Sequence, residues 1–263
     1  MGKAVVSRTS EKQDWTSCTC CCFGLFTLIC EILLFGALGL VLFWVIHYQN
    51  GFAWDEKPEL QFNYHPVLMI GGFVFLIGQA MLVHRVCRCC RRIYNKLWHT
   101  ILHLLAMPAI AIGLVAIFHV HDANNIPHLQ TMHSWMGLVT VGLFCLQFLV
   151  GFFTFLVLLC CDSSTANFRA ALHPIHIHFG LATFLMGIAT CLTGLRGKTK
   201  PVTSLTLSEF IPKGLQNTGD KIEEPWVMNA LAMTLVGVGL MMAFIIRYQR
   251  FQRNSAVMLS ERL

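Results

Sequence analysis

Residues 64–85 read YHPVLMIGGFVFLIGQAMLVHR, and this stretch indicates the fold class. No charged side chain occurs between the histidine near its start and the His84-Arg85 pair at its end. A helix that crosses a lipid bilayer needs about 20 predominantly apolar residues, so we expect a transmembrane helix here. Five more stretches have the same character. The six predicted transmembrane helices run approximately over residues 23–46, 66–83, 97–118, 134–159, 174–195 and 226–246.

The composition supports this interpretation. Of the 263 residues, 56% are hydrophobic and 12% are charged. An average soluble domain carries about 25% charged residues, so a soluble enzyme is disfavoured, and the high hydrophobicity excludes a disordered chain. The net charge of +6 does not indicate a nucleic-acid partner, because the basic residues lie between apolar stretches and form no single face. The apolar runs are continuous, unlike β-barrel strands. The sequence therefore predicts an all-α polytopic membrane protein with six transmembrane helices.

The basic residues predict the orientation of the chain. Thirteen of the 19 Lys and Arg residues lie in the N-terminal segment, the second and fourth loops and the C-terminal tail. By the positive-inside rule these segments are cytosolic, and both termini are cytosolic with them. We expect three regions: a cytosolic segment 1–22, a membrane domain 23–246 with its core at 65–195, and a cytosolic basic tail 247–263. The membrane itself is left open between a vesicle, an endosome or lysosome, and the plasma membrane.

The cysteines agree with this topology. Most of the 12 cysteines lie at predicted cytosolic helix ends, in clusters at 18–22, 87–90 and 160–161, and no cysteine lies in a predicted exoplasmic loop. We therefore expect no disulfide framework. The first two clusters are either unmodified or palmitoylated. Their spacing is not that of a zinc or iron–sulfur site.

The chain has 12 histidines, and imidazoles inside a membrane are candidates for function. His65 and His133 begin the second and fourth predicted helices at the exoplasmic side; we call them the outer pair. His99 and His176 lie near the cytosolic start of the third and fifth helices; we call them the inner pair. If helices two to five form a four-helix bundle, each pair brings two imidazoles face to face, which is the arrangement that holds a haem iron from both sides. Two such haems would carry electrons across the membrane, with no open axial position for oxygen or substrate.

Depth alone leaves other interpretations open. The histidines are compatible with a non-haem transporter of zinc or protons, or with core positions in a scaffold protein. A zinc or proton pathway favours carboxylates among the histidines, and predicted helices two to five contain none. A scaffold leaves four matched histidines unexplained. His103 lies on the same helical face as His99 and competes with it as a ligand. Glu31 is the one acidic residue inside a predicted helix, and it is protonated, paired or part of a proton route.

The chain resembles the cytochrome b561 family in four motifs that occur in order: Phe62-Asn63-Tyr64-His65-Pro66, Lys96-Leu97-Trp98-His99, His133-Ser134-Trp135 with Gly137, and His173-Pro174-Ile175-His176 with Gly180. The resemblance covers about residues 35–200. It implies a transmembrane ascorbate-dependent oxidoreductase that forms a homodimer and holds two non-covalent b-type haems, one on each histidine pair. Cytosolic ascorbate is the implied electron donor, and exoplasmic monodehydroascorbate or ferric iron is the implied acceptor.

Substrate residues follow from charge and from the resemblance. Ascorbate is a monoanion at neutral pH, and Arg92, Lys96 and Arg169 converge on the cytosolic mouth; the positive-inside rule explains part of this charge without a substrate. The family uses basic residues at matching positions. Arg85 is a candidate partner for a haem propionate. On the exoplasmic side, the resemblance implies a substrate site at His121 with Phe118 beside it.

Two departures from the family pattern concern the exoplasmic acceptor. Gln130 stands where a tyrosine is common, and Arg196-Gly197-Lys198 stands where an acidic residue is common. Lys198, together with His119 and His128, is a candidate to compensate. The path between the two histidine pairs is unaffected by either departure.

Overall fold

A computed structural model describes residues 2–54, 57–87, 90–158, 162–198 and 219–248. This part of the chain is helical, and six segments are long and apolar enough to cross a membrane. The prediction of an all-α protein with six membrane-spanning helices is confirmed. The spans are Cys22–Tyr48, Glu59–Val86, Arg92–Ala123, Met132–Phe155, Ser164–Leu195 and Glu224–Arg247. The predicted basic tail lies outside the described residues from 249 onward, as do Cys89, Cys160 and Cys161.

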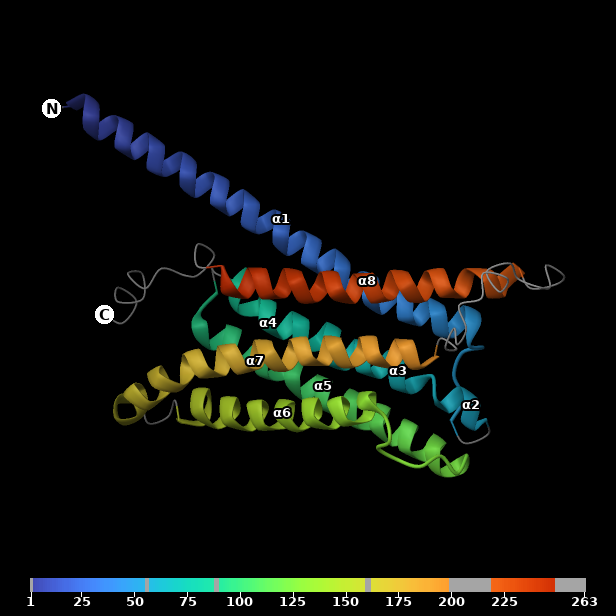
Figure 1. The fold of residues 1–263 in the computed structure, drawn as a ribbon. Coiled ribbons are helices and arrows are strands. Elements are labelled where there is room, and N and C mark those ends of the chain that lie inside the picture. Colours follow the sequence, from blue (N-terminus) through green and yellow to red (C-terminus); the bar gives the residue numbers. More distant parts are fainter. Residues whose placement is uncertain (1, 55–56, 88–89, 159–161, 199–218, 249–263) are drawn as a thin grey trace.

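The first and last helices pack together in opposite directions (Figure 1). Helix α1 (Gly2–Tyr48) is continuous, and its N-terminal part extends beyond the other helices, while α8 (Gly219–Arg247) runs back along its second half. No break in the helix marks the predicted boundary between segment 1–22 and the membrane domain. The assignment of that segment to the cytosol therefore stays a prediction from charge.

Helices α5 (Arg92–Ala123), α6 (Met132–Phe155) and α7 (Asp162–Lys198) provide three further spans. Both α5 and α7 extend past the predicted apolar stretches at each end, because helical hydrogen bonding continues into the polar residues that flank a bilayer core. Helices α6 and α7 lie side by side (Figure 1). The Thr131 side chain caps α6 by accepting a hydrogen bond from the Ser134 amide at 3.2 Å, and this cap places His133 in the first helical turn.

The second span is not a regular helix. It consists of α2 (Pro58–Gln61), α3 (Tyr64–Leu68), a π-helical segment η1 (Met69–Leu76) and α4 (Ile77–Val86). The wider turn falls on Gly71 and Gly72, and a Cβ on Gly72 would lie 2.9 Å from the Ala109 Cβ of α5. Glycine thus permits a close approach of η1 to α5. Single π-helical turns inside helices are frequent at functional sites, and this one begins four residues after His65.

The packed side of the molecule is formed by α1 and α8. Eight of the largest fully buried side chains among the described residues come from these two helices: Leu34, Val41, Trp44, Val45, Leu231, Leu235, Met242 and Ile245. At one end of the pair, Glu224 Oε1 accepts hydrogen bonds from Trp44 Nε1 at 2.9 Å and from Gln49 Nε2 at 2.8 Å. Helices α5 and α6 expose apolar side chains such as Leu105, Val115 and Phe153, and the outer faces of α1 and α8 do the same, for example at Ile32 and Leu240. Such faces suit contact with lipid, because the backbone polar groups are satisfied within each helix.

Candidate functional site

The outer pair is formed where α3 and α6 come together. The ring centres of His65 and His133 are 6.0 Å apart, and the ring planes are nearly perpendicular at 86°. The Nδ1 of His65 is 3.0 Å from the Gly113 carbonyl oxygen of α5, and the Nδ1 of His133 is 2.9 Å from the Thr190 carbonyl oxygen of α7. Four helices therefore meet at this site, two that supply imidazoles and two that supply the oxygens holding them.

The inner pair joins α5 to α7. The ring centres of His99 and His176 are 6.3 Å apart, with ring planes at 73°. The Nδ1 of His99 donates a hydrogen bond to the Ala80 carbonyl oxygen of α4 at 2.8 Å. The Nδ1 of His176 is buried and has no hydrogen-bond partner among the described residues. The Phe155 ring lies 5.3 Å from the His176 ring and packs against it.

Both spacings fit a metal ion held between two imidazoles. If the two nitrogens lie on opposite sides of the metal, bonds of about 2.0 Å, with about 1.15 Å from each nitrogen to its ring centre, place the two ring centres about 6.3 Å apart. A carbonyl oxygen only accepts hydrogen bonds, so Nδ1 carries the proton in His65, His99 and His133, and Nε2 keeps the lone pair that binds a metal. The donor set of each pair suits the iron of a haem, which takes two axial imidazoles.

Two glycines leave room for the imidazoles. A Cβ on Gly151 of α6 would lie 2.7 Å from Cε1 of His176, and a Cβ on Gly194 of α7 would lie 2.7 Å from Cε1 of His133. Real Cβ atoms essentially never approach so closely, so any side chain at either position would displace the ring. The two pairs share this feature although different helices supply it.

The other histidines near the inner pair do not have this spacing. The His99 ring centre is 4.4 Å from that of His103 and 5.0 Å from that of His84, both shorter than the separations within the outer and inner pairs. Within the described residues, no group of three or more His, Cys, Asp or Glu side chains is arranged to hold a metal ion. His103, whose Nδ1 is buried without a partner among the described residues, lies beside His99.

The predicted cytosolic mouth carries basic side chains from several helices. Arg92 and Lys96 lie in the first turns of α5, and Lys96 and Arg85 are close enough to His173 for their positive charges to act on its ring. The Arg85 guanidinium donates a hydrogen bond to the Ile246 carbonyl oxygen at 2.6 Å, which ties α4 to the end of α8. Arg169 donates to the Leu158 carbonyl oxygen at 3.4 Å. The roles predicted for these four residues stay predictions.

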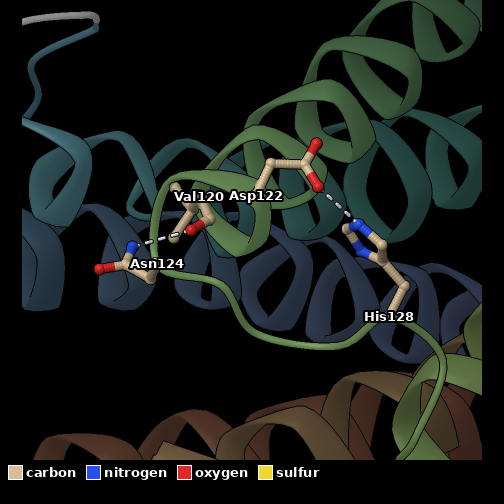
Figure 2. A network of polar contacts seen from close by, with 4 residues as sticks. All are labelled: Val120, Asp122, Asn124 and His128. Carbon is tan, nitrogen blue, oxygen red and sulfur yellow. Dashed lines mark hydrogen bonds and ion pairs between the residues drawn. The ribbon is translucent and has the colours of Figure 1, made fainter.

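The opposite mouth is formed by the end of α5 and the loop that follows it (Figure 2). The His128 ring lies 5.0 Å from Phe118 and stacks on His121 with ring centres 5.5 Å apart. His128 Nε2 donates to Asp122 Oδ1 at 2.8 Å, and Asn124 Nδ2 closes the helix end on the Val120 carbonyl oxygen at 2.8 Å. The structure thus brings Phe118, His121 and His128 together. Lys198 is the last residue of α7, and its side chain lies outside the described part of the chain.

Three polar contacts were not anticipated from the sequence. Gln61 is 1% exposed, and its Oε1 accepts a hydrogen bond from His119 Nδ1 at 2.7 Å. Asn63 Nδ2 donates to the carbonyl oxygens of Gln49 and Gly51 and so fixes the loop between α1 and the second span. Gln79 Nε2 donates to Glu31 Oε2 at 2.5 Å. Amide side chains within or beside an apolar stretch are the only signal in the sequence, and they do not indicate which residues they contact.

Comparison with known proteins gives consistent results. The family model of eukaryotic cytochrome b561 matches residues 64–200. A mouse lysosomal membrane ascorbate-dependent ferrireductase is 32% identical over 254 residues, which cover 91% of this chain and 96% of the mouse protein. A plasma membrane ascorbate-dependent reductase of Xenopus laevis is 39% identical over 170 residues, covering 63% of this chain and 58% of the frog protein. A bovine transmembrane ascorbate-dependent reductase is 38% identical over 172 residues, covering 65% and 66%.

Proposed function

The chain belongs to the eukaryotic cytochrome b561 family, and on that premise we propose that it carries electrons from cytosolic ascorbate across the membrane to an exoplasmic acceptor. The observation that supports this most directly is the presence of two interhelical histidine pairs, with ring centres 6.0 Å and 6.3 Å apart, one between α3 and α6 and the other between α5 and α7. In this proposal His65 and His133 hold the outer haem, and His99 and His176 hold the inner haem. The sequence has no Cys-x-x-Cys-His motif, so both haems are bound without covalent attachment.

A haem held by both imidazoles of a pair would supply one-electron transfer without an open position for oxygen. The protein residues supply orientation and insulation. The Gly113, Ala80 and Thr190 carbonyl oxygens fix the rings of His65, His99 and His133, so that each Nε2 stays directed toward its partner ring. The lipid-facing apolar surface of α5 and α6 keeps water and ions away from the path between the two pairs.

Ascorbate reaches the inner pair through the basic mouth. Arg92, Lys96 and Arg169 attract the ascorbate monoanion by long-range electrostatics and bind its enolate oxygen. Arg85 lies on α4 one turn beyond the Ala80 carbonyl that holds His99, which is a suitable position for a carboxylate group of the haem. Electrons thus enter at the positively charged end of the molecule, which the charge distribution assigns to the cytosol together with both termini.

On the exoplasmic side Phe118, His121 and Lys198 contact the acceptor in this proposal, with His128 beside them (Figure 2). The acceptor is ferric iron or monodehydroascorbate. The relative that matches along almost its whole length is named for ferric iron reduction at the lysosomal membrane, and the shorter match is named for the plasma membrane. In both membranes the acceptor side is the one opposite to the cytosol.

Vesicles that contain the purified protein test the proposal. Ascorbate is enclosed inside, and a ferric chelate or monodehydroascorbate is supplied outside. We expect a b-type haem absorbance spectrum that is reduced by the enclosed ascorbate and reoxidised by the external acceptor, at a rate well above that of protein-free vesicles. A colourless protein, or acceptor reduction only when ascorbate leaks out, would contradict transmembrane electron transfer.

A further inference from the structure

The loop that follows α5 folds back over the end of that helix. The Ile126 amide donates a hydrogen bond to the His121 carbonyl oxygen at 2.8 Å, and the Asn125 amide donates to the Asp122 carbonyl oxygen at 3.2 Å. Asn125 has a φ of 52°, a left-handed conformation that asparagine tolerates better than most residues. This reversal returns His128 to the helix end, where its ring stacks on His121 and bonds to Asp122, the contact drawn as a dashed line in Figure 2.

The contact with Asp122 decides which ring nitrogen of His128 is available. His128 Nε2 lies 2.8 Å from Asp122 Oδ1. An ionised carboxylate only accepts hydrogen bonds, so in the neutral ring the proton is on Nε2 and the lone pair is on Nδ1. A carboxylate on the other nitrogen is a common support for a metal-binding histidine, because it orients the ring and makes the free nitrogen more basic. His128 thus has a lone pair prepared for a metal ion.

His121 supplies a second imidazole at a suitable distance. The ring centres of His121 and His128 are 5.5 Å apart, with ring planes at 13°. Bonds of about 2.0 Å to one metal ion, with about 1.15 Å from nitrogen to ring centre, place two ring centres about 4.5 Å apart for a right angle at the metal and about 6.3 Å apart for a straight line. The observed separation lies between these limits. His121 is also close enough to His65 of the outer pair for electrostatic interaction between the two rings.

The two mouths of the molecule differ in charge. The predicted cytosolic mouth carries the basic side chains that are proposed to bind ascorbate, whereas residues 118–132 contain one formally charged side chain, Asp122, and no lysine or arginine. The Asp122 side chain is 69% exposed and that of His128 is 36% exposed, so both are accessible from the solution. A carboxylate at the entrance repels the monodehydroascorbate anion and attracts a metal cation, and imidazole nitrogen is a suitable ligand for iron.

We propose that the acceptor at this mouth is a ferric ion in a chelate, bound directly by His128 Nδ1 together with His121, while Asp122 positions the His128 ring. This inference rests on the proposed function and selects one of its two acceptors. The bound ferric ion gains one electron and becomes ferrous, the outer haem loses that electron, and no proton or group is transferred.

A substrate needs fewer protein ligands than a resident metal ion. A resident site takes three or four, and the described residues contain no such cluster. A ferric chelate arrives with ligands of its own, so two imidazoles are enough to hold it for the transfer of one electron. A site with two protein ligands also releases the ferrous product, which a closed metal site would retain.

Acceptor kinetics in vesicles that contain the haem-loaded full-length protein and enclosed ascorbate test the proposal. We expect His128→Ala to raise the KM for external ferric nitrilotriacetate by at least about tenfold, because loss of even a supporting residue of a metal ligand costs about 10–100-fold in affinity. The KM for monodehydroascorbate should change by less than about twofold, since His128 does not bind that acceptor in this proposal. Asp122→Ala should raise the ferric KM by about tenfold, and Asp122→Asn by less, because the amide oxygen still accepts the hydrogen bond from Nε2.

A redox-inert probe separates binding from electron transfer. Gallium(III) nitrilotriacetate resembles the ferric chelate in charge and size but accepts no electron. It should inhibit ferric reduction competitively in the unmodified protein, and it should show calorimetric binding that His128→Ala lacks. His47→Ala removes an exposed imidazole at the outer end of α1 and is the matched control, so it should leave both KM values and gallium binding unchanged.

Several outcomes would overturn the proposal. One is that the unmodified protein reduces monodehydroascorbate but not ferric nitrilotriacetate. Another is that His128→Ala changes both KM values equally or changes neither, and a third is that the gallium chelate binds equally well to His128→Ala. A protein that holds no haem, or that passes electrons to neither acceptor, contradicts the proposed function instead.

Discussion

The outer and inner pairs have nearly the same ring separation but are supported differently. Both outer imidazoles are held by backbone carbonyl oxygens, from Gly113 and Thr190. In the inner pair only His99 has such a bond, while the Nδ1 of His176 is buried without a partner. Packing against Phe155 and the space above Gly151 position His176 in place of a hydrogen bond. The two pairs therefore have similar ring separations, but both imidazoles of the outer pair are hydrogen-bonded to the backbone and only one imidazole of the inner pair is.

This difference bears on how each pair binds a metal. A hydrogen bond from Nδ1 to a carbonyl oxygen fixes the tautomer, orients the ring and makes Nε2 a better donor. The loss of such a partner typically costs about 10–100-fold in metal affinity. The rings of His84 and His103 lie beside His99 in the inner pair, whereas the Thr193 hydroxyl lies near His133 in the outer pair. We therefore expect the inner haem to be the more weakly bound of the two.

Removal of one ligand from each pair should have the largest effect. We expect His133→Ala and His176→Ala each to lower the haem content from about two per chain toward about one, because a non-covalent haem that loses one of two imidazole ligands is held less tightly. The haem-to-protein ratio and the two midpoint potentials measure the result, and each variant should lose a different potential.

His178→Ala is the matched control, since His178 lies two residues from His176 and its Nδ1 is bonded within α7 to the Pro174 carbonyl oxygen. It should keep both haems. If His176→Ala also keeps both, the pairing of His99 with His176 is wrong. If His103→Ala removes a haem in its place, His103 is the ligand and the comparison between the two pairs must be redrawn.

Alanine in place of Gly151 or Gly194 should affect the two histidine pairs differently. The Cβ of Gly151→Ala would lie 2.7 Å from the His176 ring, and the Cβ of Gly194→Ala would lie 2.7 Å from the His133 ring. His176 has no hydrogen bond to oppose its displacement, so we expect a loss of inner haem affinity of about 10–100-fold. His133 is restrained by Thr190, so Gly194→Ala should strain the helix and show a lower melting temperature as well as weaker outer haem binding.

Gly142→Ala provides the control, because a Cβ there would meet nothing within 4 Å. It should leave haem content and melting temperature unchanged. Haem dissociation rates, measured by transfer to an excess of apomyoglobin, and thermal unfolding give the two readouts. Equal effects of Gly142→Ala and Gly151→Ala would show that the contact with His176 does not matter.

The sequence predicted the spans because apolar length is a property of composition. Each predicted stretch corresponds to one observed span, since about 20 apolar residues have no other stable arrangement in a bilayer. The depth of each histidine followed from the same boundaries, and depth brought His65 to His133 and His99 to His176. Helix period left His103 in competition with His99, and the structure places the two rings side by side, 4.4 Å apart.

Other features depend on contacts between residues far apart in the chain. The π-helical segment could not be read from Gly71 and Gly72, because paired glycines also occur in regular helices that pack closely. The carbonyl oxygens that hold the imidazoles belong to the backbone, so no residue type identifies them. Glu31 was recognised as unusual, but its partner Gln79 lies on another helix, and only the packing of α1 against α4 brings the two together.

A charge change at the basic mouth should have an intermediate effect that is confined to the inner end. We expect Lys96→Gln to raise the KM for ascorbate by about three- to tenfold without loss of either haem, because one positive charge near an anion site contributes modestly in water. The effect should shrink at high ionic strength, since salt screens the attraction. Initial rates of haem reduction by ascorbate in stopped flow measure it.

Lys57→Gln removes an exposed positive charge ahead of α2, at the outer end, and is the control for Lys96→Gln. It should change the KM for cytosolic ascorbate by less than about twofold. If both variants behave alike, the mouth acts through net charge alone. If Lys57→Gln has the larger effect, the assignment of the two ends to cytosol and exoplasm is reversed.

The smallest effect is expected at Thr193, and it shows which group orients the outer ligand. The Thr193 Oγ1 lies 3.4 Å from the Nδ1 of His133, which is too long for a strong hydrogen bond, and donates to the Thr190 carbonyl oxygen at 2.8 Å. The hydroxyl and the imidazole therefore share one acceptor.

Thr193→Val keeps the shape of the side chain and removes the competing donor, so His133 should keep its bond to Thr190. Outer haem dissociation should change by no more than about twofold. A tenfold faster loss would show that the hydroxyl group, and not the backbone carbonyl, holds the ring, and the outer pair would then depend on a replaceable side chain.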